Sequence, residues 1–428
     1  MHASCRQSWR CRVPVRLPRL GGLARTSLLV MFWQGIRMLC LAAWIIVGAR
    51  VLGADNYGLF SGTVGTASAL AGLVGLGGGM LMYQYAAADR SRFARYWKQC
   101  LLLCVISAGP LSLVFYLLSA GLLSWPALCL IALSEIVAFP FVTNAAFALS
   151  ANDRMGWSAA LPALNALLRL AAICIFSALP ASADLTAYLA LHLAASACSA
   201  LLALLAVRCL LKPGPAKARI SRGDLMHGSG HAAGWSSSVG VTTLDKSFVL
   251  HAGGSAVAGQ YSAAYRIAAV FAMPLDAMIM SAMPRLFRAQ RDNTQHRRLV
   301  ASMILAALGY GIAASAVLGY GAHMLPHLLG SDFTAAIPGL QWMGLFVVGY
   351  SVRQIGCHTL LGRGWKLRKF LVEALGLLLM AALSALWIPA YGLQGAVWMI
   401  ITAEAVMACI AWLVVSFSPA PASASAQR

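Results

Sequence analysis

Long apolar segments separated by short polar ones make up most of this sequence. Twelve of them have about 20 residues, the length that a helix needs to cross a hydrocarbon core about 30 Å thick. They cover residues 28–49, 57–81, 99–120, 126–149, 158–179, 186–207, 231–251, 257–281, 299–320, 338–360, 370–389 and 393–415. The pattern predicts an all-α integral membrane protein with about twelve transmembrane helices.

The composition argues against a soluble fold. Hydrophobic residues make up 60% of the 428 residues, charged residues only 10%, and the mean hydropathy is +0.76. Soluble domains carry about 25% charged residues. A soluble protein of this length could not hide so much apolar surface, so we expect the helices to lie in lipid.

The net charge of +20 suggests a nucleic-acid partner, but the positions of the basic residues argue against one. With the N-terminus inside, 26 of the 32 Lys and Arg residues lie on the inner side, one in the outer loops and five within spans. The inner ones are six in 1–27, four in 86–98, one at 154, five in 208–222, five in 285–298, four in 363–369 and one at 428. This positive-inside asymmetry predicts cytoplasmic termini, contact with anionic membrane lipids and no nucleic-acid partner.

The same pattern predicts the organisation of the chain. Residues 1–27 are rich in Arg and lack acidic residues, which indicates a basic cytoplasmic tail, with a transit peptide as the alternative. Residues 208–228 form a basic cytoplasmic linker that divides the spans into an N-terminal lobe, 28–207, and a C-terminal lobe, 229–415. Residues 416–428 would be a second cytoplasmic tail.

An internal repeat supports two lobes. Residues 53–61 (GADNYGLFS) align with residues 254–262 (GSAVAGQYS) without a gap, at an offset of 201. The matching pairs are Gly53 and Gly254, Gly58 and Gly259, Phe60 and Tyr261, and Ser61 and Ser262. Each copy precedes the second span of its half. The repeat therefore predicts two pseudo-symmetric six-helix lobes related by an axis along the membrane normal, as in one class of transporters.

Ionisable residues in spans are costly and usually face a cavity or a partner. The basic candidates are Arg37, Arg169, Lys246 and Arg266, with Arg50 at the outer mouth. They would give a central cavity excess positive charge, which suits an anionic headgroup such as a diphosphate, since Arg binds phosphate through paired hydrogen bonds. The alternative is internal pairing, for example of Lys246 with an acid on a neighbouring helix.

Other charges in the spans have other interpretations. Arg353 lies in the inner half of its span, so the simplest interpretation is that its side chain snorkels to the interface. Asp245 and Lys246 are neighbours, point about 100° apart and are not expected to face one partner helix. The candidates for binding a coupling ion are Glu135, Asp245, Asp276 and Glu404, with a neutral buried carboxyl as the alternative.

The sequence contains no motif that indicates a catalytic centre. His227 with His231, and His323 with His327, have the i, i+4 spacing of metal ligands, but two histidines do not make a metal site. The glycines at 75, 77, 78 and 79 lack the strand–turn–helix context of a nucleotide loop and are better explained by close helix packing. We therefore expect no metal, no cofactor and no enzymatic activity.

Four segments are similar to a known family. ARVLGADNYGLFSGTVGTASALAGLVGLGGG (49–79) resembles the first outer loop and second span of bacterial polysaccharide and O-antigen flippases. LDKSFVLHAGGSAVAGQYSAAYRIAAVFAMPL (244–275) resembles their seventh and eighth spans, LLGSDFTAAIPGLQWMGL (328–345) the loop before the tenth, and YGLQGA (391–396) the start of the twelfth. These flippases belong to the multidrug/oligosaccharidyl-lipid/polysaccharide exporter superfamily.

The resemblance implies two lobes around a central cavity that opens alternately to each side of the bacterial inner membrane. It also implies a lipid-linked oligosaccharide as cargo, and other polysaccharide-assembly proteins as partners. Arg37 and Arg266 fall on spans that carry cationic residues in related peptidoglycan-precursor flippases. Those proteins usually have two more spans, which argues against the peptidoglycan role.

Two other functions stay open. A small-molecule or drug exporter of the same superfamily would favour acidic residues in its cavity, and the surplus of basic residues argues against it. A membrane polymerase or acyltransferase of the same pathway would need a catalytic group near one face of the membrane.

Overall fold

The computed structural model describes residues 20–180, 184–289 and 293–417, and it contains helices and connecting turns. The α-helices are α1 (Leu20–Ala71), α2 (Gly78–Ala88), α3 (Phe93–Ser119), α4 (Trp125–Ile131), α5 (Phe139–Ala151), α6 (Met155–Ser177), α7 (Leu185–Leu211), α8 (Arg222–Ala289), α9 (Asn293–Gly321), α10 (Leu325–Leu329), α11 (Ile337–Gly362) and α12 (Lys366–Phe417). Short 3₁₀ segments lie at Arg90–Arg92, Ala322–Met324 and Ser331–Ala336, and a π-helix at Ala132–Ala138.

The three longest helices are folded hairpins. α1, α8 and α12 are interrupted by non-helical backbone at Gly53, Gly254 and Gly392. In α1 the rings of Trp44 and Phe60 lie 5.4 Å apart, whereas 16 residues of straight helix would separate them by about 24 Å. Each of these helices therefore consists of two antiparallel arms.

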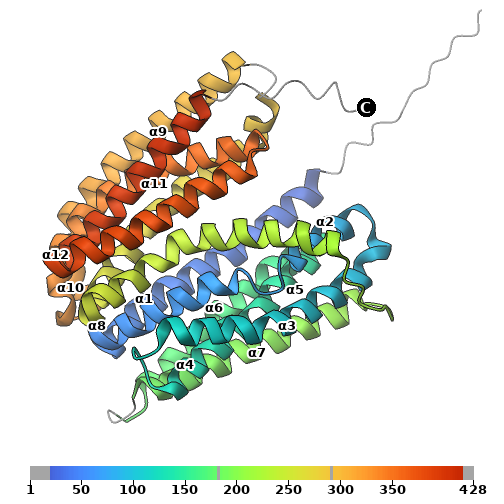
Figure 1. Ribbon diagram of the computed structural model, residues 1–428, viewed down its shortest axis with the longest axis horizontal. Helices are drawn as coiled ribbons and strands as arrows, with labels where there is room; N and C mark the ends of the chain where they lie inside the picture. Colours follow the sequence, from blue (N-terminus) through green and yellow to red (C-terminus); the bar gives the residue numbers. More distant parts are fainter. Residues whose placement is uncertain (1–19, 181–183, 290–292, 418–428) are drawn as a thin grey trace, which may run out of the picture.

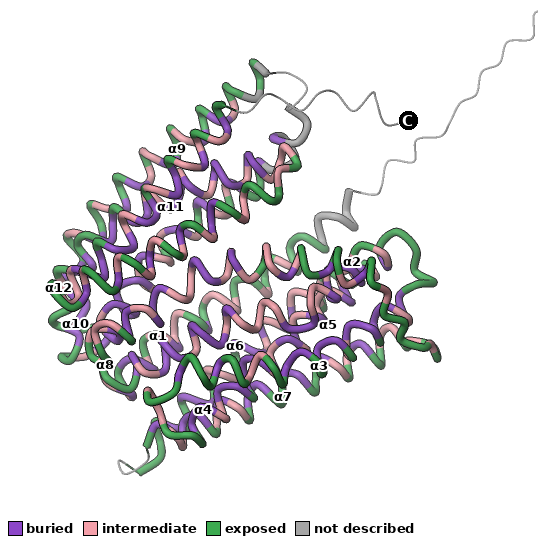
Figure 2. Tube along the Cα trace, viewed as in Figure 1, coloured by how far each residue is buried: buried purple, intermediate pink, exposed green. Residues whose placement is uncertain are grey.

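The described residues contain nine helical segments long and apolar enough to span a membrane, and three of these are the hairpins. Counted by arms, they are consistent with the twelve predicted spans. Figure 2 shows exposed residues along α3 and α9. They include large apolar residues, namely Val105 and Leu113 on α3 and Leu305 and Ile312 on α9. Such a surface is stable only against lipid, so the chain is an integral membrane protein.

The predicted repeat has a structural counterpart. Gly53 (φ 69°, ψ 173°) and Gly254 (φ 80°, ψ 179°) have the same left-handed backbone, which L side chains rarely adopt. A Cβ at Gly58 would lie 2.0 Å from the carbonyl oxygen of Ser255, and one at Gly259 would lie 1.9 Å from that of Ala54. Ala54 and Ser255 are also 201 residues apart. The two hairpins therefore contact each other reciprocally.

The helices form two bundles (Figure 1). The first holds α1–α7 and the second α9–α12, and the arms of α8 lie between and within them. We call the end with Gly53 and Gly254 the hairpin end, and the end with the α7–α8 connection the linker end. The bundles meet at the hairpin end, where Ser255 donates a 2.6 Å hydrogen bond to Asp55, and their ribbons diverge toward the linker end.

Two predicted spans are locally irregular. The span 57–81 is broken between α1 and α2 by a turn with left-handed residues at Gly75, Leu76 and Gly77. A Cβ at Gly77 would lie 2.0 Å from the carbonyl oxygen of Gly228, so close packing of this glycine run is confirmed. The π-helix ends just before Pro140, which has no N–H to continue α-helical bonding.

The helices extend beyond the predicted segments. α7 ends at Leu211 and α8 begins at Arg222, so the non-helical part of the linker is residues 212–221. The start of α1 and the end of α12 both lie at the linker end (Figure 1). Most of the predicted N-terminal tail and residues 418–428 lie outside the described residues.

Candidate functional site

The first bundle pairs Arg169 with Glu135. Glu135 lies in the π-helix and is buried, and its carboxylate accepts a 2.6 Å hydrogen bond from Arg169 of α6. The Arg169 side chain is 19% exposed, and Ser196 of α7 also binds its guanidinium. The ion pair compensates the charge of Arg169 within the first bundle. Arg169 is thus an internally paired cation.

A hydrogen-bonded chain runs from this pair to the boundary between the bundles. His192 of α7 contacts Glu135 at 2.9 Å, and the hydroxyl of Tyr188 lies 3.5 Å from Nδ1 of His192. The indole Nε1 of Trp44, on the first arm of α1, donates a 3.0 Å hydrogen bond to the Tyr188 hydroxyl. The chain holds the indole of Trp44 in a defined orientation.

Lys246 is paired with its neighbour Asp245, which corrects the expectation from helix geometry. Nζ of Lys246 lies 2.8 and 3.0 Å from the carboxylate oxygens of Asp245. Both side chains contact the second arm of α8: Tyr261 donates a 2.7 Å hydrogen bond to Asp245, and Lys246 lies over the ring of Tyr265. The backbone directions diverge, but the long Lys side chain turns back to its neighbour.

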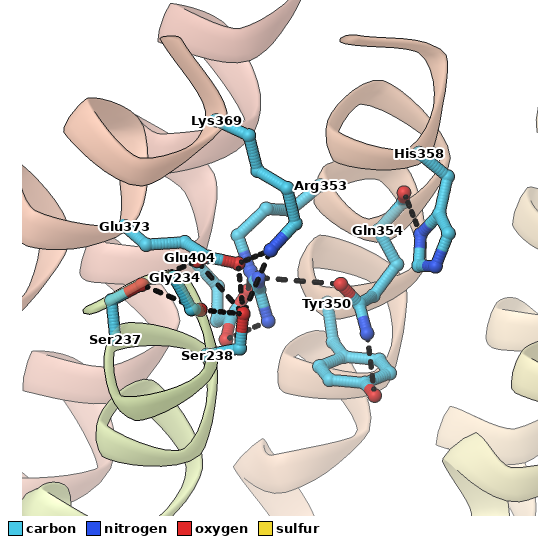
Figure 3. A network of polar contacts seen from close by, with 10 residues as sticks. All are labelled: Gly234, Ser237, Ser238, Tyr350, Arg353, Gln354, His358, Lys369, Glu373 and Glu404. Carbon is cyan, nitrogen blue, oxygen red and sulfur yellow. Dashed lines mark hydrogen bonds and ion pairs between the residues drawn. The ribbon is translucent and has the colours of Figure 1, made fainter. Parts of the chain in front are cut away.

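Arg353 does not snorkel, because it is 2% exposed and paired with Glu404, which is 1% exposed (Figure 3). Its Nε and a second guanidinium nitrogen donate to the two carboxylate oxygens of Glu404. The pair joins α11 to the second arm of α12. Glu404 is therefore engaged by a guanidinium rather than open to an ion.

A second carboxylate cluster in this bundle was missed by the sequence analysis. Glu373 of α12 is buried, lies 2.7 Å from Nζ of Lys369 and accepts hydrogen bonds from Ser237 and Ser238 of α8 (Figure 3). Lys369 also donates a 2.7 Å hydrogen bond to Ser238. The i, i+4 spacing of Lys369 and Glu373 at the start of a predicted span is the signal that could have indicated this pair.

Asp276 differs from the other three acidic candidates. It is half-buried in α8, and the hydroxyl of Tyr350 donates to it at 3.0 and 3.1 Å. Gln354 in turn donates a 3.0 Å hydrogen bond to Tyr350. Within the part of the chain that the structure describes, Asp276 has no cationic partner within salt-bridge distance.

Arg50 lies at the hairpin end, away from the middle of the spans. It is exposed and donates hydrogen bonds to the carbonyl oxygens of His327 and Leu328, the latter at 2.7 Å. These carbonyls belong to the last turn of α10, where helical acceptors lack intrahelical partners. Arg50 thus connects the first bundle to the second.

Arg266, on the second arm of α8, contacts aromatic rings instead of an acid. Its guanidinium carbon lies 4.7 Å from the ring centroid of Trp44 and 5.3 Å from that of Tyr57. Both rings belong to α1, so Arg266 crosses the boundary between the bundles. Cation–π contacts use the face of the guanidinium and leave its N–H groups available to an acceptor.

Arg37 is the second basic candidate without an acid. It is half-buried in the first arm of α1, and no hydrogen bond or ion pair from another described residue reaches it. It precedes Trp44 by seven residues, so both lie on one face of the arm, about 10 Å apart along its axis. Arg37 lies on the linker side of Trp44.

The five predicted cations therefore divide into three groups. Arg169 and Lys246 are neutralised within their bundles, Arg50 binds backbone carbonyls, and Arg37 and Arg266 keep their charge unpaired among the described residues. The unpaired ones share a face of α1 and its contact with α8. Two guanidinium groups without an acidic partner among the described residues suit a multivalent anion.

The aromatic and histidine partners of these groups were also missed by the sequence analysis. Trp44, Tyr57, Tyr188 and His192 lie in apolar spans, where aromatic residues are usual. His192 was the one detectable signal, because a histidine within a span calls for a partner.

The sequence profile of one family, described as “Polysaccharide biosynthesis protein”, matches residues 23–290. No curated protein sequence matches the chain significantly.

Solved structures of transporters share the fold. The chain is similar to the inward-facing conformation of a multidrug resistance MATE family transporter of the MOP superfamily, with a TM-score of 0.71 and 15% identity over 90% of this chain and 96% of that one. It is similar to the lipid II flippase MurJ in an inward closed conformation, with a TM-score of 0.67 and 13% identity over 92% and 88%. For an outward-facing MATE transporter the TM-score is 0.61 and the identity 16%, over 91% and 93%. These likenesses establish the MATE- and MurJ-like transporter fold.

Proposed function

Because the chain belongs to the polysaccharide biosynthesis protein family, we propose that it is a flippase for a polyprenyl-diphosphate-linked oligosaccharide. It carries this cargo from the inner to the outer leaflet of the bacterial inner membrane, for assembly of surface polysaccharide or of the O-antigen of lipopolysaccharide. It acts as a transporter rather than as an enzyme, and its partners are the lipid-linked oligosaccharide, membrane lipids and other assembly proteins.

The observation that carries the proposal is the pair of arginines without acidic partners. Leaving a cation unpaired in a membrane-spanning segment costs free energy unless a ligand compensates it. Arg37 and Arg266 offer fork-shaped donors that match the oxygens of a diphosphate. Such a site compensates its charge only when cargo is bound.

The arrangement of the bundles supports alternating access. They are joined at the hairpin end and diverge toward the linker end (Figure 1). If the positive-inside pattern sets the orientation, the linker end and both termini face the cytoplasm. The structure then corresponds to the state that receives cargo from the inner leaflet.

Among the acidic candidates, the contacts favour Asp276 for ion coupling. Glu135, Asp245 and Glu404 are held by Arg169, Lys246 and Arg353. Asp276 is half-buried, accepts hydrogen bonds from the Tyr350 hydroxyl and has no cation within salt-bridge distance among the described residues. It can therefore exchange a proton or bind a cation without breaking an ion pair.

The test is the double variant Arg37→Ala/Arg266→Ala, with membrane expression verified. We expect loss of polymer export and accumulation of the lipid-linked intermediate in the inner leaflet. Purified protein in vesicles should likewise fail to flip a fluorescent polyprenyl-diphosphate oligosaccharide. The matched control is Lys217→Ala/Arg219→Ala, which removes two linker cations and should leave transport intact. Normal flipping by the first double variant would refute the site.

The drug-exporter alternative rests on Asp276, an acid open to a cationic compound. Under this alternative, a deletion strain would become sensitive to cationic drugs while polymer export continued. Under the flippase proposal, drug sensitivity stays unchanged. Polymerisation of sugars or acyl transfer by the purified protein would favour the enzymatic alternative.

A further inference from the structure

A surface pocket of about 530 Å³ lies at the linker end of the first bundle. It is lined by side chains of α3, of α7 and of the start of the linker, namely Trp97, Leu101, Leu204, Arg208, Lys212 and Pro213. α3 and α7 form the side of this bundle that faces away from the second bundle (Figure 1). The pocket is therefore separate from Arg37 and Arg266.

The pocket changes from apolar to cationic along the helix axes. Leu204 and Arg208 are four residues apart and therefore lie on one face of α7, one turn apart, and Lys212 directly follows the end of the helix. Trp97 and Leu101 have the same spacing on α3. The leucines lie deeper in the span and the cations lie at its end. This polarity matches a ligand with an anionic head and an apolar tail.

The two cations have no acidic partner. Arg208 and Lys212 are exposed, and no carboxylate elsewhere in the described chain lies within salt-bridge distance of either. At the same end of the molecule, Arg92 is paired with Asp89. Hydrogen bonds from Ser91 lower the pKa of Asp89 below its usual value.

The tryptophan adds a second feature of a lipid site. Trp97 is 5% exposed and stacks on Phe93, with ring centroids 6.3 Å apart, so its ring forms a fixed wall of the pocket. Tryptophan is enriched at the level of the headgroups, where its ring contacts both chains and head. A general attraction of the basic linker to the membrane would require neither this wall nor the leucines.

We propose that this pocket binds one anionic glycerophospholipid from the leaflet at the linker end. Arg208 and Lys212 hold the phosphate, and the acyl chains lie along Leu101 and Leu204. The occupant comes from the bilayer itself, because the same two helices expose the apolar side chains of Leu102, Leu201 and Leu205, and the charge of the pocket is complementary to an acidic headgroup. The site goes beyond the flippase function, since it does not hold cargo.

The test is native mass spectrometry of the full-length protein in neutral detergent, titrated with dioleoyl phosphatidylglycerol or dioleoyl phosphatidylcholine. The wild type should retain one phosphatidylglycerol more tightly than the choline lipid. Arg208→Ala/Lys212→Ala should weaken this binding about 30-fold, since each cation contributes about 1 kcal/mol. Lys217→Ala/Arg219→Ala removes the same charge from the same linker outside the pocket and should change binding less than threefold.

Two further measurements distinguish binding of the whole lipid from binding of its headgroup alone. Leu204→Asn keeps both cations but removes the apolar wall, and it should also weaken retention of phosphatidylglycerol. Soluble glycerol 3-phosphate should not displace the lipid. Equal weakening by the two double variants, equal retention of the two lipids, or displacement by glycerol 3-phosphate would each overturn the proposal. These measurements are independent of cargo transport.

Discussion

Arg353 and Arg266 are both arginines in membrane-spanning helices, but one lies inside a bundle and the other at the boundary between bundles. Arg353 is 2% exposed, and Glu404 accepts hydrogen bonds from its guanidinium. Arg266 lies against the rings of Trp44 and Tyr57 and has no acidic partner among the described residues. The first is part of the fold, whereas the second carries a charge that the fold leaves uncompensated. An uncompensated charge is kept where a ligand or a moving interface requires it.

Glu135, with its partners Arg169 and His192, forms a cluster that is intermediate between the fully buried Arg353 pair and the unpaired Arg266. Its arginine, Arg169, is paired like Arg353 but remains 19% exposed. Through His192 and Tyr188 the cluster reaches Trp44, on which Arg266 rests. Buried residues of the first bundle therefore orient the Trp44 ring, which Arg266 of α8 contacts at the boundary between the bundles.

The comparison predicts that disrupting the buried pair has the largest effect on stability. Arg353→Met leaves the Glu404 carboxylate buried without a partner and should lower the free energy of unfolding by about 3–5 kcal/mol. Arg353→Met/Glu404→Leu removes both charges and should recover most of that loss. Thermal unfolding in detergent measures both variants. A single variant as stable as the wild type would contradict the interpretation of this pair as structural.

The second-largest loss of stability is expected at the contact between the α1 and α8 hairpins. Gly259→Ala places a Cβ 1.9 Å from the carbonyl oxygen of Ala54 and should cost about 1–3 kcal/mol. Gly109→Ala is the matched control, because no heavy atom lies within 4 Å of its Cβ position in α3. The same unfolding assay should show the control unchanged or slightly more stable. A Gly259→Ala variant as stable as Gly109→Ala would contradict a close contact between the two hairpins at this position.

The connection between the Glu135 cluster and the boundary between the bundles can be tested by substitutions of Trp44. Trp44→Phe keeps a ring for Arg266 but loses the indole donor to Tyr188, and it should cost about 1 kcal/mol. Trp44→Leu loses the ring as well, so transport of the lipid-linked cargo should fall further than in Trp44→Phe. Vesicle flipping and unfolding of both variants check this order. Identical transport in the two variants would show that the ring does not position Arg266.

The smallest effect on stability is expected at Arg266. Arg266→Ala loses cation–π contacts worth about 0.5–2 kcal/mol but also removes an unpaired charge from a partly buried position. The two terms oppose each other, so unfolding should change by less than about 1 kcal/mol while cargo transport is lost. A loss of stability as large as that of Arg353→Met would show that Arg266 is also a structural residue and would contradict the proposed difference between the two arginines.

Much of the fold could be predicted because lipid imposes a simple requirement on sequence. Segments of about 20 apolar residues must be helices that satisfy their own backbone. The repeat around Gly53 and Gly254 could also be recognised in the sequence, since left-handed backbone and close contact both require glycine. The turn between α1 and α2 was harder to predict, because the glycines at 75 and 77 fit both packing and a break.

The sequence by itself determined that the chain lies in a membrane, roughly where its helices lie, and which spans carry charged residues. Only the tertiary structure decided which of those charges are free. Whether an arginine meets a carboxylate depends on residues far along the chain, such as Glu404 for Arg353, 51 positions away. Nothing local in the sequence shows that Arg353 has an acidic partner and Arg37 has none, because the difference lies in what the neighbouring helices present to each side chain.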